Sequence, residues 1–159
     1  DLQVSENYTY DLLHTVIPYI QERFPVSKDC EHTYIMGSSL GALYACYLGN
    51  AYPDSFGAVG LFSNCPFLAP ISFQNFMESH LNYNLRNFHY VGMRESSDGM
   101  FDENAYFNET KKLHEYLKSH GVKSKLVVDV NGVHNEETWE KHVLDFLSFI
   151  YFDDIDITL

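Results

Sequence analysis

Short apolar segments alternate with helical segments along the chain, and this alternation restricts the fold more than any other feature. The segments with strand character cover residues 32–36, 58–62, 88–91 and 125–130. Connections that contain a helix of ten or more residues suit parallel strands joined by right-handed crossovers. Strands that are apolar throughout are typical of a sheet covered on both faces. The sequence therefore predicts one α/β domain with a mainly parallel sheet over residues 1–159.

The helices are predicted from apolar residues at helical spacing. We expect a kink or a locally missing hydrogen bond at Pro18, because proline has no N–H to donate. Gly121 follows the helix that ends at His120, a position that favours a left-handed cap. The last helix is expected to be continuous. The predicted helices cover residues 8–24, 40–50, 73–80, 105–120 and 136–151.

Composition and charge exclude several classes of protein. The chain is 45% hydrophobic, which provides enough apolar surface for a core and excludes a disordered chain. No apolar run is long enough to span a membrane. A net charge of −12 repels phosphate backbones, so nucleic acid is not expected as a partner. Three cysteines without CxxC spacing indicate neither a disulfide framework nor a zinc site, and favour a reducing, cytoplasmic location.

Residues 37–41, Gly-Ser-Ser-Leu-Gly, match the pattern G-x-S-x-G directly after an apolar strand and at the start of a helix. This is the setting of a nucleophile elbow, in which Ser39 exposes its hydroxyl at the helix N-terminus. A turn this tight leaves little room for flanking side chains, so we expect glycine to be required at both Gly37 and Gly41. The alternative interpretation is a plain glycine-rich turn between strand and helix, or a phosphate cradle.

A serine nucleophile needs a base, and the base needs an acid. His134 lies between the fourth strand and the last helix. Loops at the carboxyl ends of parallel strands gather at one edge of the sheet, and a histidine that comes last fits the order Ser, acid, His. The loop after the third strand offers Glu95 and Asp98, with two further acids behind them. Its spacing does not match a calcium loop, and neither a metal nor a cofactor is expected.

With these residues in place, the chain resembles the C-terminal part of an α/β-hydrolase of the esterase D group. More narrowly, it resembles the bacterial tributyrin-esterase-like carboxylesterases. The matching stretches cover residues 34–41, 52–56, 71–76 and 132–141, and the last of them has a histidine followed five residues later by tryptophan. The resemblance implies a three-layer α/β-hydrolase fold and a serine carboxylesterase that hydrolyses short-chain acyl esters, with a small-molecule ester as its partner.

The resemblance also implies roles for individual residues. Ser39 is the nucleophile and His134 the base, and the backbone N–H of Leu40 is the first oxyanion-hole donor. In relatives the acid lies three residues after the glycine that ends its strand, which places it on Glu95, with Asp98 as the alternative. Relatives often carry aspartate there. Many relatives also have methionine in place of Leu40 and an aromatic residue at position 135, differences that bear on substrate fit.

Family members have about four more strands before the helix that opens this chain. Those strands include the loop that donates the second oxyanion-hole N–H, and the sequence contains no candidate for this donor. The resemblance therefore implies a fragment of a larger hydrolase or a truncated relative, of which we favour the fragment. We expect the open edge at residues 32–36 to be covered by a second polypeptide, by a second copy of the chain in a homo-oligomer, or by upstream residues.

Two alternative functions remain open. One is an acyltransferase or thioesterase of the same superfamily, and the other is a non-catalytic, truncated hydrolase-like module. Aromatic residues are frequent over residues 62–90, which is consistent with the walls of an apolar pocket. Such residues more often belong to the core, so we expect most of them to be buried there.

Overall fold

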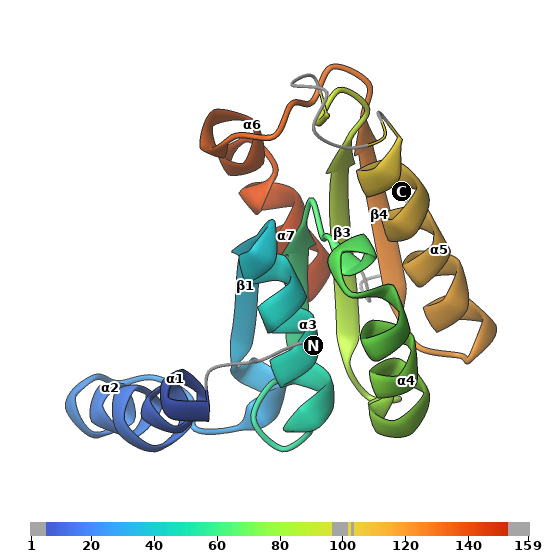
Figure 1. Ribbon diagram of the computed structural model, residues 1–159. Coiled ribbons are helices and arrows are strands. Elements are labelled where there is room, and N and C mark those ends of the chain that lie inside the picture. Colours follow the sequence, from blue (N-terminus) through green and yellow to red (C-terminus); the bar gives the residue numbers. More distant parts are fainter. Residues whose placement is uncertain (1–5, 97–101, 103, 153–159) are drawn as a thin grey trace.

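The computed structural model describes residues 6–96, 102 and 104–152. Four strands form one sheet in the order β1-β2-β3-β4, and every pair of neighbours is parallel (Figure 1). The predicted α/β architecture is thereby confirmed. The strands are β1 (Tyr34–Ser38), β2 (Ala58–Phe62), β3 (Arg86–Gly92) and β4 (Ser124–Asp129).

Helical segments connect the strands. None of them, over the part of the chain that the structure describes, is long and apolar enough to cross a membrane. The α-helices are α1 (Glu6–Asp11), α2 (Ile17–Arg23), α3 (Leu40–Ala51), α4 (Pro70–His80), α5 (Ala105–Ser119), α6 (Glu136–Glu140) and α7 (Val143–Tyr151). Shorter helical turns are η1 (Leu12–Val16), η2 (Cys30–His32) and η3 (Pro66–Leu68).

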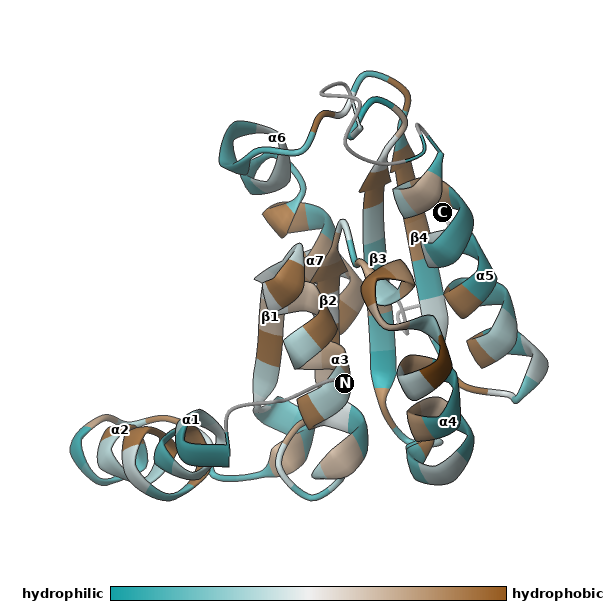
Figure 2. Ribbon diagram, in the orientation of Figure 1, coloured by the Kyte–Doolittle hydropathy of each residue, from teal (hydrophilic) through white to brown (hydrophobic). Residues whose placement is uncertain are grey.

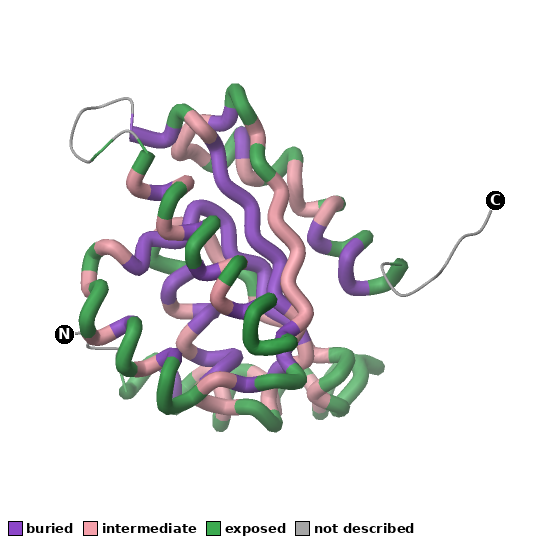
Figure 3. The backbone as a smooth tube through the Cα atoms, turned by 90° about the vertical axis from the view of Figure 1, so that its right-hand side faces the viewer, coloured by how far each residue is buried: buried purple, intermediate pink, exposed green. Residues whose placement is uncertain are grey.

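Helices cover both faces of the sheet and make three layers. A core of α3, α4 and α5 side chains packs on one face, where Leu43, Met77 and Leu113 are buried. On the other face, Phe146 and Phe149 of α7 pack against the sheet. Burial is deepest in β2 and β3, whereas β4 is only partly buried (Figure 3). Burial on both faces explains why β2 is apolar throughout rather than alternating.

The carboxyl ends of the strands lie at a common edge of the sheet. Ser38 of β1 is level with Phe62 of β2, and Phe62 is level with Tyr90 of β3. Gly92, at the end of β3, is level with Asp129, at the end of β4. The residues that follow these four strands therefore meet at this edge.

Local sequence signals are confirmed at two helix positions. Gly121 has φ +75 and follows α5, as predicted for a left-handed cap. The first helical region contains the π-helical turn η1 immediately before the turn that carries Pro18. Proline cannot donate to the carbonyl four residues earlier, and a wider turn accommodates that gap.

Most predicted bounds differ from the structure by one or two residues, and three differences have a local physical reason. β1 begins at Tyr34 rather than residue 32, because η2 occupies the preceding residues. α4 begins at Pro70, three residues earlier than predicted, since proline is well tolerated in a first helical turn. The prediction of one continuous last helix is wrong. The chain leaves helical geometry at His142, which is the N-cap of α7, and His142 Nδ1 lies 2.7 Å from an Asp145 carboxylate oxygen.

β1 is an edge strand: within the described residues it pairs with β2 alone. Met36, in the middle of β1, is 45% exposed. α1 and α2 extend away from the sheet beside this edge (Figure 1) and display brown, apolar stretches (Figure 2). Among their exposed apolar residues are Tyr19 and Ile20. An exposed edge with apolar surface beside it favours association with another strand.

We expect the purified 159-residue chain to self-associate through this edge unless another polypeptide segment pairs with β1. Sedimentation should then show species larger than the 18.4 kDa monomer. Hydrogen exchange should be slower in the associated species at those amides of residues 34–38 that point away from β2, because pairing protects backbone N–H groups. A chain that sediments as a monomer at all concentrations, with rapid exchange of these amides, contradicts the prediction.

Candidate active site

Ser39 occupies a strained turn between β1 and α3. Its backbone has φ 55 and ψ −121, a conformation that non-glycine residues seldom adopt. The turn is held because the Ser39 N–H donates to Phe62 O at 2.9 Å and the Ser39 carbonyl accepts from Ala42 N at 3.0 Å. Leu40 is the first residue of α3, so its N–H has no acceptor within the helix and is available at the helix N-terminus.

The two glycines that flank Ser39 are not equivalent. A Cβ on Gly37 would collide with the carbonyl group of Gly41 and lie 3.0 Å from Ala42 N, so the close approach of strand and helix requires glycine there. A Cβ on Gly41 would meet no atom within 4 Å among the described residues. The expectation that both positions require glycine is therefore confirmed for Gly37 and wrong for Gly41, because only Gly37 faces the backbone across the turn.

This difference predicts opposite effects for one added methyl group. Gly37→Ala is expected to destabilise the chain by about 1–3 kcal/mol, as for overpacking in a core, and to lower Tm by roughly 3–10 °C. Gly41→Ala is the matched control. It should leave Tm unchanged or raise it slightly, since alanine favours a helix by about 1 kcal/mol over glycine. Thermal unfolding followed by circular dichroism measures both, and equal Tm values for the two variants would contradict the assignment.

Glu95 lies in the loop after β3, and its side chain is only 1% exposed. Its Oε1 accepts two hydrogen bonds, from the Gly92 N–H and from the Ser63 hydroxyl, both at 2.6 Å. Its Oε2 lies 3.0 Å from Nδ1 of His134. Both oxygens of the buried carboxylate thus have partners, and these contacts fix its orientation.

Backbone contacts hold the loops that carry Glu95 and His134 against each other. The Met93 N–H donates to Asp129 O at 2.9 Å, and the Arg94 N–H donates to Gly132 O at 3.0 Å. A Cβ on Gly92 would collide with the Gly132 carbonyl, so the two loops approach closely because glycine occupies this position. The acid–histidine contact is therefore set by the ends of β3 and β4.

His134 is enclosed by aromatic rings on two sides. Its ring centroid lies 4.6 Å from that of Tyr106 and 4.9 Å from that of Trp139, the latter in an edge-to-face arrangement. The side chain is 24% exposed, which leaves part of the imidazole open to solvent. Because Nδ1 is directed at Glu95, Nε2 is the ring nitrogen that is left for another partner.

The Ser39 hydroxyl makes no hydrogen bond to His134 in the described part of the chain. It lies beside the thiol of Cys65, and this contact lowers the thiol pKa slightly. Burial has the larger, opposite effect and raises the pKa of Cys65 to about 11, so the thiol is neutral at physiological pH. Ser39 and the Glu95–His134 pair lie at the same sheet edge, but the predicted hydrogen bond between serine and histidine is not formed.

Of the two candidate acids, Glu95 is the one whose carboxylate contacts His134 in the structure. Asp98 lies outside the described residues. Asp102, behind them in the chain, is exposed, and its carboxylate accepts a hydrogen bond from the Asn104 N–H. Sequence reasoning missed the contacts of Ser63 and Cys65 with these residues, because a single serine or cysteine after a strand gives no signal of its own.

Most aromatic residues over 62–90 belong to the core, as expected from the sequence. Phe62, Phe88 and Tyr90 are at most 1% exposed.

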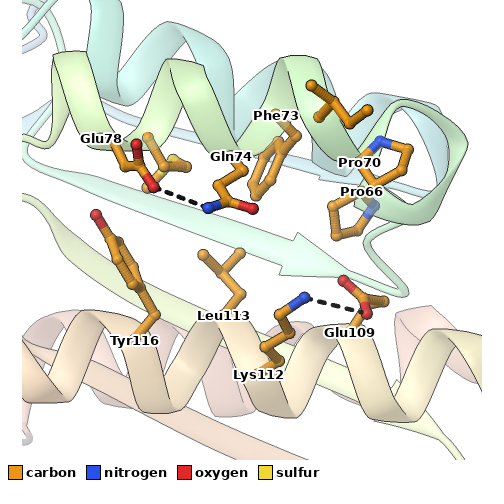
Figure 4. Close-up of a pocket in the computed structure, with 11 residues that line it drawn as sticks. Pro66, Pro70, Phe73, Gln74, Glu78, Glu109, Lys112, Leu113 and Tyr116 are labelled. Atoms are coloured by element: carbon orange, nitrogen blue, oxygen red, sulfur yellow. Dashed lines mark hydrogen bonds and ion pairs between the residues drawn. The ribbon is translucent and has the colours of Figure 1, made fainter.

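A separate apolar groove of about 270 Å³ lies between α4 and α5, with Phe73 and Leu113 in its lining (Figure 4). Polar side chains at the rim of the groove contact one another: the Gln74 amide donates to the Glu78 carboxylate, and Lys112 forms an ion pair with Glu109. Neither Ser39, Glu95 nor His134 lines this groove.

Comparison with known proteins gives matches over most of the chain. The family described as "Putative esterase" matches residues 2–150. An uncharacterised protein of Bacillus subtilis (strain 168), YbbA, is 24% identical over 148 residues, which are 91% of this chain and 59% of YbbA. The chain thus spans about three fifths of the length of this curated relative.

Solved structures show the same fold. A ferulic acid esterase superposes with a TM-score of 0.72 at 20% identity, over 90% of this chain and 60% of the esterase. An S-formylglutathione hydrolase, FrmB, from Staphylococcus aureus superposes with a TM-score of 0.69 at 14% identity, over 91% of this chain and 61% of the hydrolase. The parallel sheet between helical layers is accordingly that of an α/β-hydrolase, over part of the length of these enzymes.

Proposed function

We propose a serine carboxylesterase activity for this chain, which belongs to the esterase family. The observation that carries the proposal is the buried Glu95 carboxylate 3.0 Å from His134 Nδ1, at the sheet edge where the strained Ser39 turn also lies. A carboxylate that orients a histidine, at a sheet edge that also carries a partly buried serine, is the set of groups that nucleophilic acyl transfer requires. The proposed substrates are small esters with short acyl groups.

In the proposed reaction, His134 donates its Nδ1–H to Glu95 and holds an unprotonated Nε2. A rotation about the Cα–Cβ bond of Ser39 moves the hydroxyl from the Cys65 thiol towards Nε2. Nε2 then takes the hydroxyl proton as Oγ bonds to the ester carbonyl carbon, and the carbonyl π electrons move to the oxygen. When the tetrahedral intermediate collapses, Nε2–H returns the proton to the leaving alkoxide. Water repeats these steps on the acyl-enzyme and releases the acid.

The developing oxyanion needs hydrogen-bond donors. The N–H of Leu40, at the N-terminus of α3, supplies one of them, and the helix dipole favours negative charge there. In α/β-hydrolases a second N–H comes from a loop earlier in the fold. We propose that the polypeptide segment that pairs with the β1 edge also supplies this second donor. Its absence would cost roughly 2.7–4 kcal/mol in the transition state.

A fluorophosphonate probe tests the proposal, because it forms a covalent bond only with an activated serine. We expect mass spectrometry to locate the adduct on Ser39 and hydrolysis of p-nitrophenyl acetate or butyrate to be lost in proportion. The probe is applied to the chain when exchange at residues 34–38 shows that the β1 edge is covered. If Ser39 stays unlabelled under that condition, the catalytic interpretation is wrong and a non-catalytic module is supported.

A further inference from the structure

Two side chains beyond the expected site residues connect to the Glu95 carboxylate. Trp139 Nε1 donates to Ser63 Oγ at 2.8 Å, and the Ser63 hydroxyl donates to Glu95 Oε1 at 2.6 Å. The other carboxylate oxygen faces His134. We propose that Ser63 and Trp139 are positioning residues, which form a hydrogen-bond relay that fixes Glu95 against His134. This inference rests on the proposed function and deepens it.

The direction of each hydrogen bond in the relay is determined by chemistry. An indole N–H can only donate, so the Ser63 oxygen accepts from Trp139. A hydroxyl has one proton, and the Ser63 proton therefore goes to Glu95, which accepts on both oxygens when ionised. The relay thus has a single low-energy arrangement, and that arrangement turns Oε2 towards the imidazole.

The backbone of Ser63 supports a role for its hydroxyl. Ser63 is fully buried and has φ 52, a left-handed conformation that glycine adopts more readily than serine. Its N–H donates to Tyr90 O at 2.8 Å, which continues the sheet ladder by one residue beyond β2. A strained, buried residue that is not glycine persists only where its surroundings hold it, and strain of this kind is concentrated at functional sites.

Trp139 contacts His134 directly and is linked to Glu95 through Ser63. Its N–H reaches Glu95 through Ser63, while its ring packs edge-to-face against the His134 imidazole at 4.9 Å. Trp139 lies on α6, the short helix that follows His134 and begins at the N-cap Asn135, whose side chain accepts from the Thr138 N–H. The helix start thereby fixes the tryptophan relative to the histidine. One side chain restricts the motion of both partners.

Substitutions that delete one donor each test the relay. Ser63→Ala removes the hydroxyl, and Trp139→Phe removes the indole N–H while it keeps an aromatic ring. We expect each to lower kcat by about 10- to 100-fold with little change in KM. Ser63→Ala deletes the hydrogen bond to the Glu95 carboxylate, and Trp139→Phe deletes the donor that directs the Ser63 proton to that carboxylate. The double variant should lose no more than the worse single variant, because both substitutions break one chain of hydrogen bonds.

A second readout does not need turnover. The Nδ1 proton of His134, hydrogen-bonded to a carboxylate, should give a downfield proton NMR signal. In Ser63→Ala and Trp139→Phe this proton should exchange with water at least about tenfold faster, because the carboxylate is less firmly oriented. The measurement remains informative if Ser39 proves not to be a nucleophile, so failure of the relay and failure of the proposed function can be distinguished.

Two further variants separate positioning from mere packing. Thr110→Val removes a fully buried hydroxyl that has no hydrogen-bond partner among the described residues. It lies far from the relay along the chain, and its loss should change neither kcat nor the His134 signal. Ser63→Gly relieves the backbone strain but still deletes the hydroxyl, so it should keep or raise Tm and still lower kcat. The proposal is overturned if Ser63→Ala and Trp139→Phe both leave kcat within twofold and the exchange of the His134 proton unchanged.

Discussion

Ser39→Ala is expected to abolish covalent labelling by a fluorophosphonate and to lower kcat for short-chain esters by at least about four orders of magnitude. The reason is that no acyl-enzyme can form without the Oγ nucleophile, and only binding and the oxyanion-hole donors then remain to assist attack by water. Labelling detected by mass spectrometry and initial rates on p-nitrophenyl butyrate measure the two effects.

Folding should be nearly unaffected by this substitution. Ser39 is only partly buried, and alanine can keep the same strained backbone, so a Tm within about 4 °C of the unaltered chain is expected. Ser55→Ala is a matched control, a partly buried serine before β2 and so at the opposite end of the sheet. It should retain full labelling and activity. Persistent labelling of the Ser39→Ala variant would show that another side chain is the nucleophile.

Glu95→Gln is expected to lower kcat by about 10³- to 10⁴-fold while the fold is preserved. The glutamine carbonyl can still accept from the Gly92 N–H and the Ser63 hydroxyl, which leaves its NH₂ group facing His134 Nδ1. Nδ1 must then accept, so the imidazole proton moves to Nε2, where it prevents the ring from taking the proton of Ser39. The loss comes from the wrong tautomer rather than from unfolding.

Steady-state kinetics and thermal unfolding together check this explanation. The control is Asp102→Asn, which changes an exposed carboxylate further along the same connection and keeps an oxygen for the Asn104 N–H. It should leave kcat and Tm unchanged. A Glu95→Gln variant with kcat within tenfold of the unaltered chain would mean that His134 does not depend on this carboxylate for its tautomer.

The sequence alone was sufficient to predict the parallel α/β arrangement and the position of the serine turn. Both depend on local and periodic signals: apolar strands separated by helices, and glycine at position 37, where strand and helix backbones approach closely. The cap at Gly121 could also be predicted, because a left-handed residue after a helix favours glycine in any context. These features require no knowledge of distant contacts.

Resemblance to a family placed the acid at position 95, where the residues themselves left two acids open. The structure puts the Glu95 carboxylate against His134 because β3 and β4 end level with each other and their loops are joined by backbone hydrogen bonds. Such pairing depends on contacts between segments about 40 residues apart in the chain. No local pattern encodes it.

Other features were decided only by the tertiary structure. The break in the last helix at His142 follows from side-chain contacts with Asp145 and with Asp129 of another element, so helical periodicity does not predict it. The open space at Gly41 and the contacts of Ser63 and Trp139 likewise depend on what the fold brings near each residue. The sequence by itself determined which elements form and where the serine lies, because those signals are local. Packing at the sheet edge decided which buried side chains orient the acid and the base.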